Sequence, residues 1–225
     1  MRLLDKLPAQ TYETVFGTVY AGLKINLCLL TAGLPLLLAL AAIGDPLGAW
    51  PFFVALSSLC GPAVAAAFGA FQALSDGDHR VGRAFWTAYR ASFGRSLAVA
   101  AAAAALVIVL AIDLQAAVGT RWGAATPMLA LLIGVVAAVT TAVLAVGGQR
   151  RDLPWRKLLI ACAYLSVRKW YLSLFNLVML GVLCAVVAGK PVAGLFLLPA
   201  PVLYVVWANT RHVTAPLTEH LGSPR

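Results

Sequence analysis

The sequence has little charge and few residues that bind metals or cross-link chains. Only 11% of its residues are charged, against roughly 25% in soluble domains. The 225-residue chain has three histidines and four cysteines, and no two cysteines have C-x-x-C spacing. Most of the cysteines lie in apolar runs, where cysteine acts as a small hydrophobic residue. We therefore predict no disulfide, no metal site and no cofactor.

The sequence also lacks the motifs of common enzymes. It contains no H-E-x-x-H, no P-loop, no dinucleotide-binding fingerprint and no G-x-S-x-G elbow, each of which would indicate a specific chemistry. Its histidines, His79, His212 and His220, lie in a connector or in the tail, and no nucleophile and base are paired within an apolar run. We therefore expect no catalytic residue and a protein that is not an enzyme.

Long apolar runs make up most of the chain. Hydrophobic residues account for 62% of it, and the mean hydropathy is +0.90. Six runs are long enough to cross roughly 30 Å of hydrocarbon as helices. They cover approximately residues 19–43, 51–74, 97–118, 125–146, 170–188 and 192–208. We therefore predict an all-α polytopic membrane protein, with six transmembrane helices in a single membrane domain over residues 1–225.

The positive charges predict which way the chain faces. Fifteen of the 17 Lys and Arg residues lie near the two ends or in the two longer connectors, whereas only Arg121 and Lys190 lie in short connectors. Because basic loops remain in the cytoplasm, both termini are expected to be cytoplasmic. Attraction to the lipid bilayer accounts for the formal net charge of +9, so we expect no nucleic-acid partner.

The two longer connectors, residues 78–96 and 148–169, are basic and have helical periodicity, which is weaker in the second. They predict two amphipathic interfacial helices on the cytoplasmic side. The first connector carries an aromatic face and an arginine face. Its candidate contact residues are Arg83, Phe85, Trp86, Tyr89, Arg90 and Phe93. Two roles remain open for them, namely contact with a partner protein and anchoring to the inner leaflet.

Small residues recur at every fourth position in several apolar runs. The clearest are Gly61, Ala65 and Gly69 in the second run, with Gly134 and Ala138 in the fourth. A row of small residues on one face of a helix allows the backbone of a neighbouring helix to approach closely. We expect them to pack helices within the bundle, with the interface of a homo-oligomer as the alternative.

Polar residues within the apolar runs are few. The candidate intramembrane polar contacts are Asn26, Thr140 and Asn176. Prolines such as Pro199 and Pro201 also fall within runs, where each one removes a backbone hydrogen bond and kinks a helix. Because transporters use broken helices at their binding sites, these features favour an autonomous small-solute transporter as an alternative function.

Three motifs follow one another in the first half of the chain. Asn26-Leu27 precedes Leu34-Pro35, Gly61-Pro62-Ala63 lies in the second run, and the segment 83–93 reads RAFWTAYRASF. In this order they resemble the YesL-like family of bacterial integral membrane proteins of unknown function. This chain departs from the family pattern at Cys28, near the usual Trp, and at Tyr89 and Ser92, in place of Phe and Asn.

The resemblance implies a multi-pass protein of the bacterial plasma membrane. Genes of this family often neighbour carbohydrate ABC-transporter genes, so the resemblance also implies a non-enzymatic accessory component associated with carbohydrate uptake. ABC-transporter subunits would then be its partners. The resemblance carries over no catalytic residue.

Overall fold

The computed structural model describes residues 9–43, 48–147 and 154–221, which form helices joined by turns and no strand. The long helices are α1 (Ala9–Ala42), α4 (Val81–Ala117), α5 (Thr126–Gly147), α7 (Trp170–Gly189) and α9 (Pro199–Leu221). The shorter ones are α2 (Trp50–Ser57), α3 (Cys60–Ser75), the 3-10 turn η2 (Gly123–Ala125), α6 (Trp155–Arg168) and α8 (Pro191–Leu197). The all-α prediction is therefore confirmed for this part of the chain.

Five helical stretches among the described residues are long and apolar enough to cross a membrane. They are Gly17–Ala42, Trp50–Ser75, Val81–Ala117, Gly123–Gly147 and Trp170–Val187. These stretches match the first five predicted runs and are compatible with a multi-pass membrane protein. The sixth predicted run, residues 192–208, is not among them.

The sixth run is interrupted because two prolines fall close together in it. Helix α8 ends at Leu197, and α9 begins at Pro199. Pro199 and Pro201 have no backbone N–H, so neither can continue the hydrogen bonding of a helix. Beyond the break, α9 runs into polar residues such as Asn209 and Arg211, which shortens its apolar part.

The first connector was expected to form a helix of its own, but its helix continues into the third apolar run without a break. Val81–Ala117 is one helix of 37 residues, about 55 Å long at the usual rise per residue. Gly94 is the only glycine of α4 after the first turn, and α4 contains no proline, while a lone glycine costs only about 1 kcal/mol. If the apolar half of α4 crosses the membrane, the basic half extends beyond the hydrocarbon.

The second connector is only partly visible, because residues 148–153 lie outside the described residues. Its remainder forms α6, which buries Leu158, Cys162 and Leu165 along one face. Ile160 and Tyr164 are exposed on the outside of the helix. The exposed side of α6 is therefore partly apolar, whereas a basic surface was expected.

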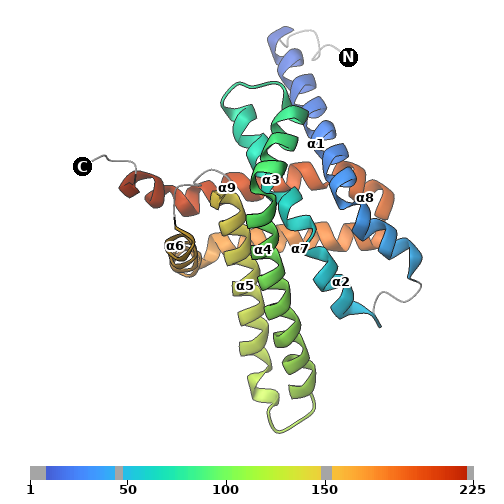
Figure 1. The fold of residues 1–225 in the computed structure, drawn as a ribbon, viewed down its shortest axis with the longest axis vertical. Coiled ribbons are helices and arrows are strands. Elements are labelled where there is room, and N and C mark those ends of the chain that lie inside the picture. Colours follow the sequence, from blue (N-terminus) through green and yellow to red (C-terminus); the bar gives the residue numbers. More distant parts are fainter. Residues whose placement is uncertain (1–8, 44–47, 148–153, 222–225) are drawn as a thin grey trace, which may run out of the picture.

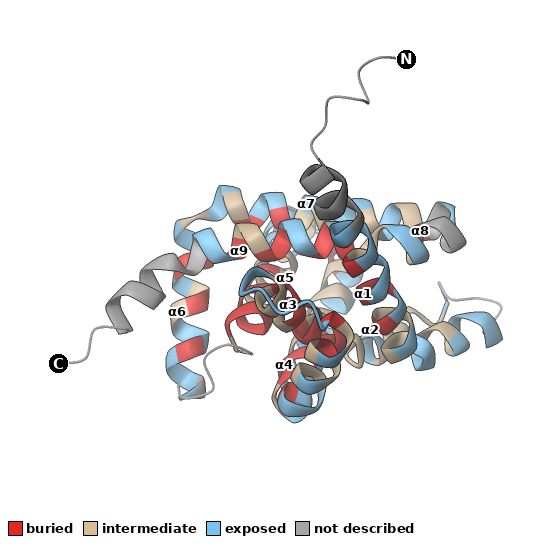
Figure 2. Ribbon diagram, turned by 90° about the horizontal axis from the view of Figure 1, so that it is seen from above, coloured by how far each residue is buried: buried red, intermediate tan, exposed pale blue. Residues whose placement is uncertain are grey.

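The helices cross one another in two directions (Figure 1). Helices α4 and α5 form a long hairpin, and its far end projects beyond the other helices. Helices α7 and α9 lie side by side and run across this hairpin, as the view in Figure 2 also shows. Thus α7 is apolar enough to span a membrane but is not aligned with α4 and α5.

The core lies around α3, where buried residues gather in Figure 2. Most of the buried side chains of α3 are alanines, with Phe68 and Phe71 as the large ones. The short side chains bring the neighbouring backbones close together, which is how helices pack in a lipid environment that provides no hydrophobic driving force. The first half of α4 therefore packs closely against α3.

Candidate functional site

The structure divides the six predicted contact residues of α4 into a buried group and an exposed group. Phe85 is 0% exposed, and Trp86 and Tyr89 are half-buried. Their rings form a continuous aromatic cluster, with centroids 5.5 Å apart for Phe85 and Trp86 and 5.4 Å apart for Trp86 and Tyr89. These aromatic residues pack α4 against the core, so Phe85 is not accessible to a partner, whereas Trp86 and Tyr89 are each partly accessible.

The exposed group consists of Arg83, Arg90 and Phe93. Both arginines are exposed, and neither forms a hydrogen bond or ion pair with any described residue. Phe93 is 38% exposed, and its ring packs on Tyr89 with centroids 5.4 Å apart. The two guanidinium groups and part of the Phe93 ring are therefore accessible in the first half of α4.

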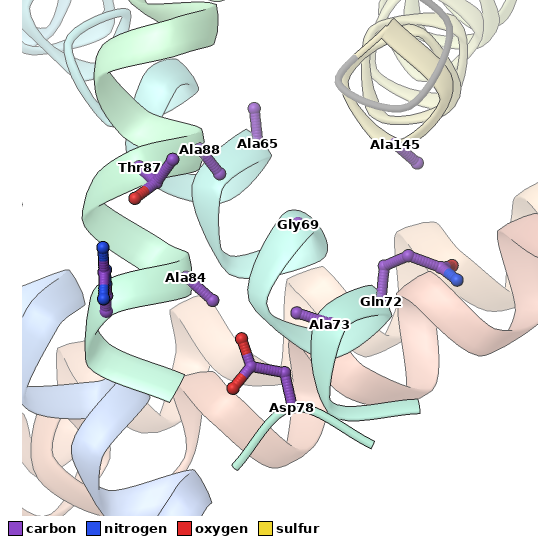
Figure 3. Close-up of a pocket in the computed structure, with 10 residues that line it drawn as sticks. Ala65, Gly69, Gln72, Ala73, Asp78, Ala84, Thr87, Ala88 and Ala145 are labelled. Carbon is purple, nitrogen blue, oxygen red and sulfur yellow. The ribbon is translucent and has the colours of Figure 1, made fainter. Parts of the chain in front are cut away.

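A pocket of about 570 Å³ opens beside Arg83, between α3, α4 and the end of α5 (Figure 3). Small residues form most of its wall. They are Ala65, Gly69 and Ala73 on α3, Ala84 and Ala88 on α4, and Ala145 on α5. The polar residues of the lining are Gln72, Asp78, Arg83 and Thr87. The pocket therefore combines an alanine and glycine wall with a few charged and polar groups.

The two charges of this pocket are not paired with each other. The Asp78 carboxylate points toward the side of α4 that carries Ala84 (Figure 3). One of its oxygens accepts the backbone N–H of Arg80 at 2.8 Å, which fixes the turn before α4. Arg83 lines the same pocket without an ion pair to Asp78. The arrangement can bind a carboxylate or phosphate at Arg83 and a hydrogen-bond donor at Asp78.

A third cation, Lys24 of α1, lies close to the start of α4. A Cβ on Gly82 would lie 3.2 Å from the Lys24 Cε, so the glycine leaves room for the lysine stem. The ammonium group lies 5.4 Å from the centroid of the Tyr20 ring, a favourable cation–π position. Lys24 thus adds to the positive charge around the first turns of α4.

Asn26 is buried and bridges the break between α8 and α9. Its Nδ2 donates to the Phe196 carbonyl at 2.8 Å, and its Oδ1 accepts the Ala200 N–H at 2.6 Å. In a continuous helix, that carbonyl and that N–H would bond to each other. The side-chain amide is therefore inserted into the helix at the position of one missing backbone bond.

Asn176 belongs to a different cluster, between α7 and α9. It donates to the Thr210 hydroxyl at 3.1 Å and accepts from the Asn209 side chain at 2.7 Å. Asn209 also donates to the Leu172 carbonyl at 2.9 Å. At the same end of these helices, the Lys169 Nζ donates to the His212 carbonyl at 2.5 Å. This network holds the two helices together.

Thr140 joins neither cluster, because its hydroxyl donates to the Val136 carbonyl of its own helix at 2.7 Å. The three predicted intramembrane contacts therefore occupy three places and do not form one polar site. Sequence reasoning missed Asn209 and Thr210, because the sixth run was expected to end at residue 208. It also did not include Asp78, the first residue of the first connector, among the candidate contact residues.

The predicted packing residues lie at helix contacts of differing closeness. A Cβ on Gly61 would collide with the Cβ of Ala100, and one on Gly69 would lie 2.8 Å from the Cβ of Ala88. A Cβ on Gly134 would lie 3.5 Å from Leu177 Cδ1, an ordinary contact. Ala65 and Ala138 are both buried.

The described residues contain no group of three or more His, Cys, Asp or Glu that could hold a metal ion. All four cysteines are free. Burial raises the pKa of the Cys162 thiol, in α6, to about 12. That thiol therefore stays protonated at neutral pH and is a poor nucleophile.

No family model, curated protein or solved structure matches the chain. The resemblance to the YesL-like family therefore stays a prediction. The residues of the α4 pocket and the surrounding charges are the basis on which function can be argued.

Proposed function

We propose that the protein is a multi-pass protein of the bacterial plasma membrane with both termini in the cytoplasm. We further propose that it is a non-enzymatic accessory component in carbohydrate uptake, and that ABC-transporter subunits dock on the cytoplasmic end of α4. The link to carbohydrate uptake rests on the YesL-like resemblance. The observation that carries docking at α4 is the pair of exposed arginines, Arg83 and Arg90, that have no partner among the described residues.

The surroundings of these arginines favour protein contact over simple anchoring. A helix that only anchors to lipid would direct its aromatic side chains outward, but Phe85 is buried and Trp86 and Tyr89 are half-buried. Both arginines lie on α4, and Arg83 lines a pocket of about 570 Å³. Such a surface suits a partner segment with acidic side chains, because guanidinium groups pair with carboxylates in a fixed geometry.

A site-specific photo-crosslinker at Thr87 tests this proposal, because Thr87 is exposed and lines the pocket. After irradiation in native membranes, mass spectrometry should identify transporter subunits. The matched control carries the same crosslinker at Leu131, an exposed residue of the projecting α4–α5 hairpin. Crosslinks to the same proteins from both positions, or only to a second copy of this chain, would contradict docking at α4.

Charge reversal tests the role of the arginines. The double variant Arg83→Glu and Arg90→Glu should lose the Thr87 crosslinks, whereas Arg121→Glu at the hairpin tip should keep them. If the double variant inserts into the membrane and still captures its partner, the arginines are not the contact.

The second candidate function is an autonomous small-solute transporter. The break between α8 and α9, bridged by Asn26, favours it, because broken helices are a feature of transporter binding sites. Thr140 and Asn176 bond elsewhere in the structure, so of the three predicted polar residues only Asn26 lies at this break. Purified protein in liposomes should then move a solute, and Asn26→Leu should abolish that flux.

A further inference from the structure

A second cavity, of about 740 Å³, lies on the other side of the bundle between α1, the end of α3 and the α8–α9 break. We call it the α1–α9 groove. Apolar residues such as Leu23, Phe71 and Phe196 form most of its wall, and none of its lining residues is charged. Its volume falls within the range of roughly 300–1,000 Å³ that is typical of ligand sites.

The polar groups of the groove are arranged along its length. Helices α1 and α3 run in opposite directions (Figure 1), so Thr18 and Ser75 lie at the same end of the groove. That end is next to the charged turn of residues 76–80. At the other end the lining includes Asn26 and Ala200, whose polar atoms are already bonded to each other across the helix break. The two aliphatic hydroxyl groups of the lining therefore lie at one end of the groove, and apart from Asn26 and Tyr204 the rest of the lining is apolar.

We propose that the α1–α9 groove binds one acyl chain of a membrane phospholipid, with the headgroup at the Thr18 and Ser75 end. An uncharged and mostly apolar cavity with Thr18 and Ser75 at one end matches the polarity of such a chain. Two of its walls, α1 and α3, belong to stretches that are apolar enough to span the membrane, so phospholipids surround the groove at high concentration. Placement of the lipid in the inner leaflet rests on the proposed orientation, whereas the groove itself does not.

Gly22 provides a direct way to block the groove. It lines the cavity, and a Cβ built on it meets no atom within 4 Å. A leucine at this position would therefore occupy the groove without displacing the helices. Gly33, on the same helix, also has no atom within 4 Å of a built Cβ but does not line the groove. Gly33→Leu is thus the matched control, because the gain in helix propensity is similar.

The experiment uses the full-length protein in liposomes that contain phosphatidylethanolamine with a photoactivatable acyl chain. After irradiation, mass spectrometry maps the labelled residues. We expect labels concentrated on residues 18–26 and 200–205, compared with exposed hairpin residues such as Leu131. Gly22→Leu should reduce the groove labels to the level of the hairpin surface, because the leucine side chain would occupy the space of the acyl chain. Gly33→Leu should leave them unchanged.

Two results would overturn the proposal. One is labelling of the groove at the same level as the hairpin surface. The other is groove labelling that survives Gly22→Leu in a protein that still elutes as a single species. Because liposomes contain no partner protein, the outcome does not depend on whether the chain docks on a transporter.

Discussion

Between α3 and α4 the backbones approach closely, because Gly61 and Gly69 have no Cβ to keep Ala100 and Ala88 away. Between α7 and α9 the contact is different, because Asn176 bonds to Asn209 and Thr210 across the two helices. Lipid provides no hydrophobic force that would drive helices together, so close packing and hydrogen bonds are the two means available. The α3–α4 pair depends on close packing, and the α7–α9 pair depends on hydrogen bonds.

The two contacts should therefore differ in what they tolerate. Where two helix backbones are in close contact, no flexible side chain lies between them, so an added side chain must move a backbone. A polar network has several donors and acceptors, and the loss of one partner leaves others in place. The predictions below test this difference with the midpoint of SDS-induced unfolding of the purified protein in mixed micelles.

The largest effect is expected for Gly61→Leu. Its Cβ would collide with the Ala100 Cβ and lie 3.2 Å from the Ser96 carbonyl oxygen, so α3 and α4 must separate. We expect a loss of at least about 3 kcal/mol in the free energy of unfolding, at the upper end of overpacking effects. Gly94→Leu is the matched control, because that glycine on α4 has open space around it. Equal midpoints for the two variants would show that the α3–α4 contact is not close.

The next largest effect is expected for Asn26→Leu, which leaves the Phe196 carbonyl and the Ala200 N–H without their partner. Unsatisfied buried groups of this kind should cost about 2 kcal/mol in total. Ala200 lies between Pro199 and Pro201, so it has the only backbone N–H among these three residues. An unchanged midpoint would mean that the Phe196 carbonyl and the Ala200 N–H bond directly once the amide is gone.

A smaller effect is expected for Asn176→Leu. Asn209 keeps its bond to the Leu172 carbonyl, and Thr210 keeps its bond to the Val206 carbonyl. We therefore expect a loss of about 1 kcal/mol, as for other hydrogen bonds between membrane helices. Thr140→Val is the control, because its hydroxyl bonds only within α5. If Asn176→Leu costs as much as Gly61→Leu, the α7–α9 network is as intolerant of change as the close packing.

These residues also show how far the sequence could lead. The apolar runs predicted five of the membrane-length stretches, because length and composition alone define such a helix. The boundary predicted between the connector 78–96 and the run 97–118 does not interrupt the helix, since a change from basic to apolar residues does not end a helix without a proline or cap. Pro199 and Pro201 predicted a kink, but nothing local indicates that Asn26, more than 170 residues away, completes it.

The candidate site shows the same limit. The arginine face of α4 was readable from helical spacing, and Arg83 and Arg90 are exposed. The pocket beside Arg83 was not readable, because it depends on Asp78 and Ala145, which lie on separate segments that only the fold brings together. Sequence spacing assigns residues to faces of one helix, whereas a pocket requires the relative positions of several.

The smallest effect is expected for Gly134→Ala, although Gly134 has the same four-residue spacing to Ala138 as Gly61 has to Ala65. The added Cβ would lie 3.5 Å from the end of the Leu177 side chain, a normal contact that needs no backbone movement. We expect a change in the free energy of unfolding within about 0.5 kcal/mol, since the gain in helix propensity offsets any small adjustment. A loss comparable to that of Gly61→Leu would show that α5 and α7 pack as closely as α3 and α4. The spacing of small residues alone would then be enough to identify a close helix contact.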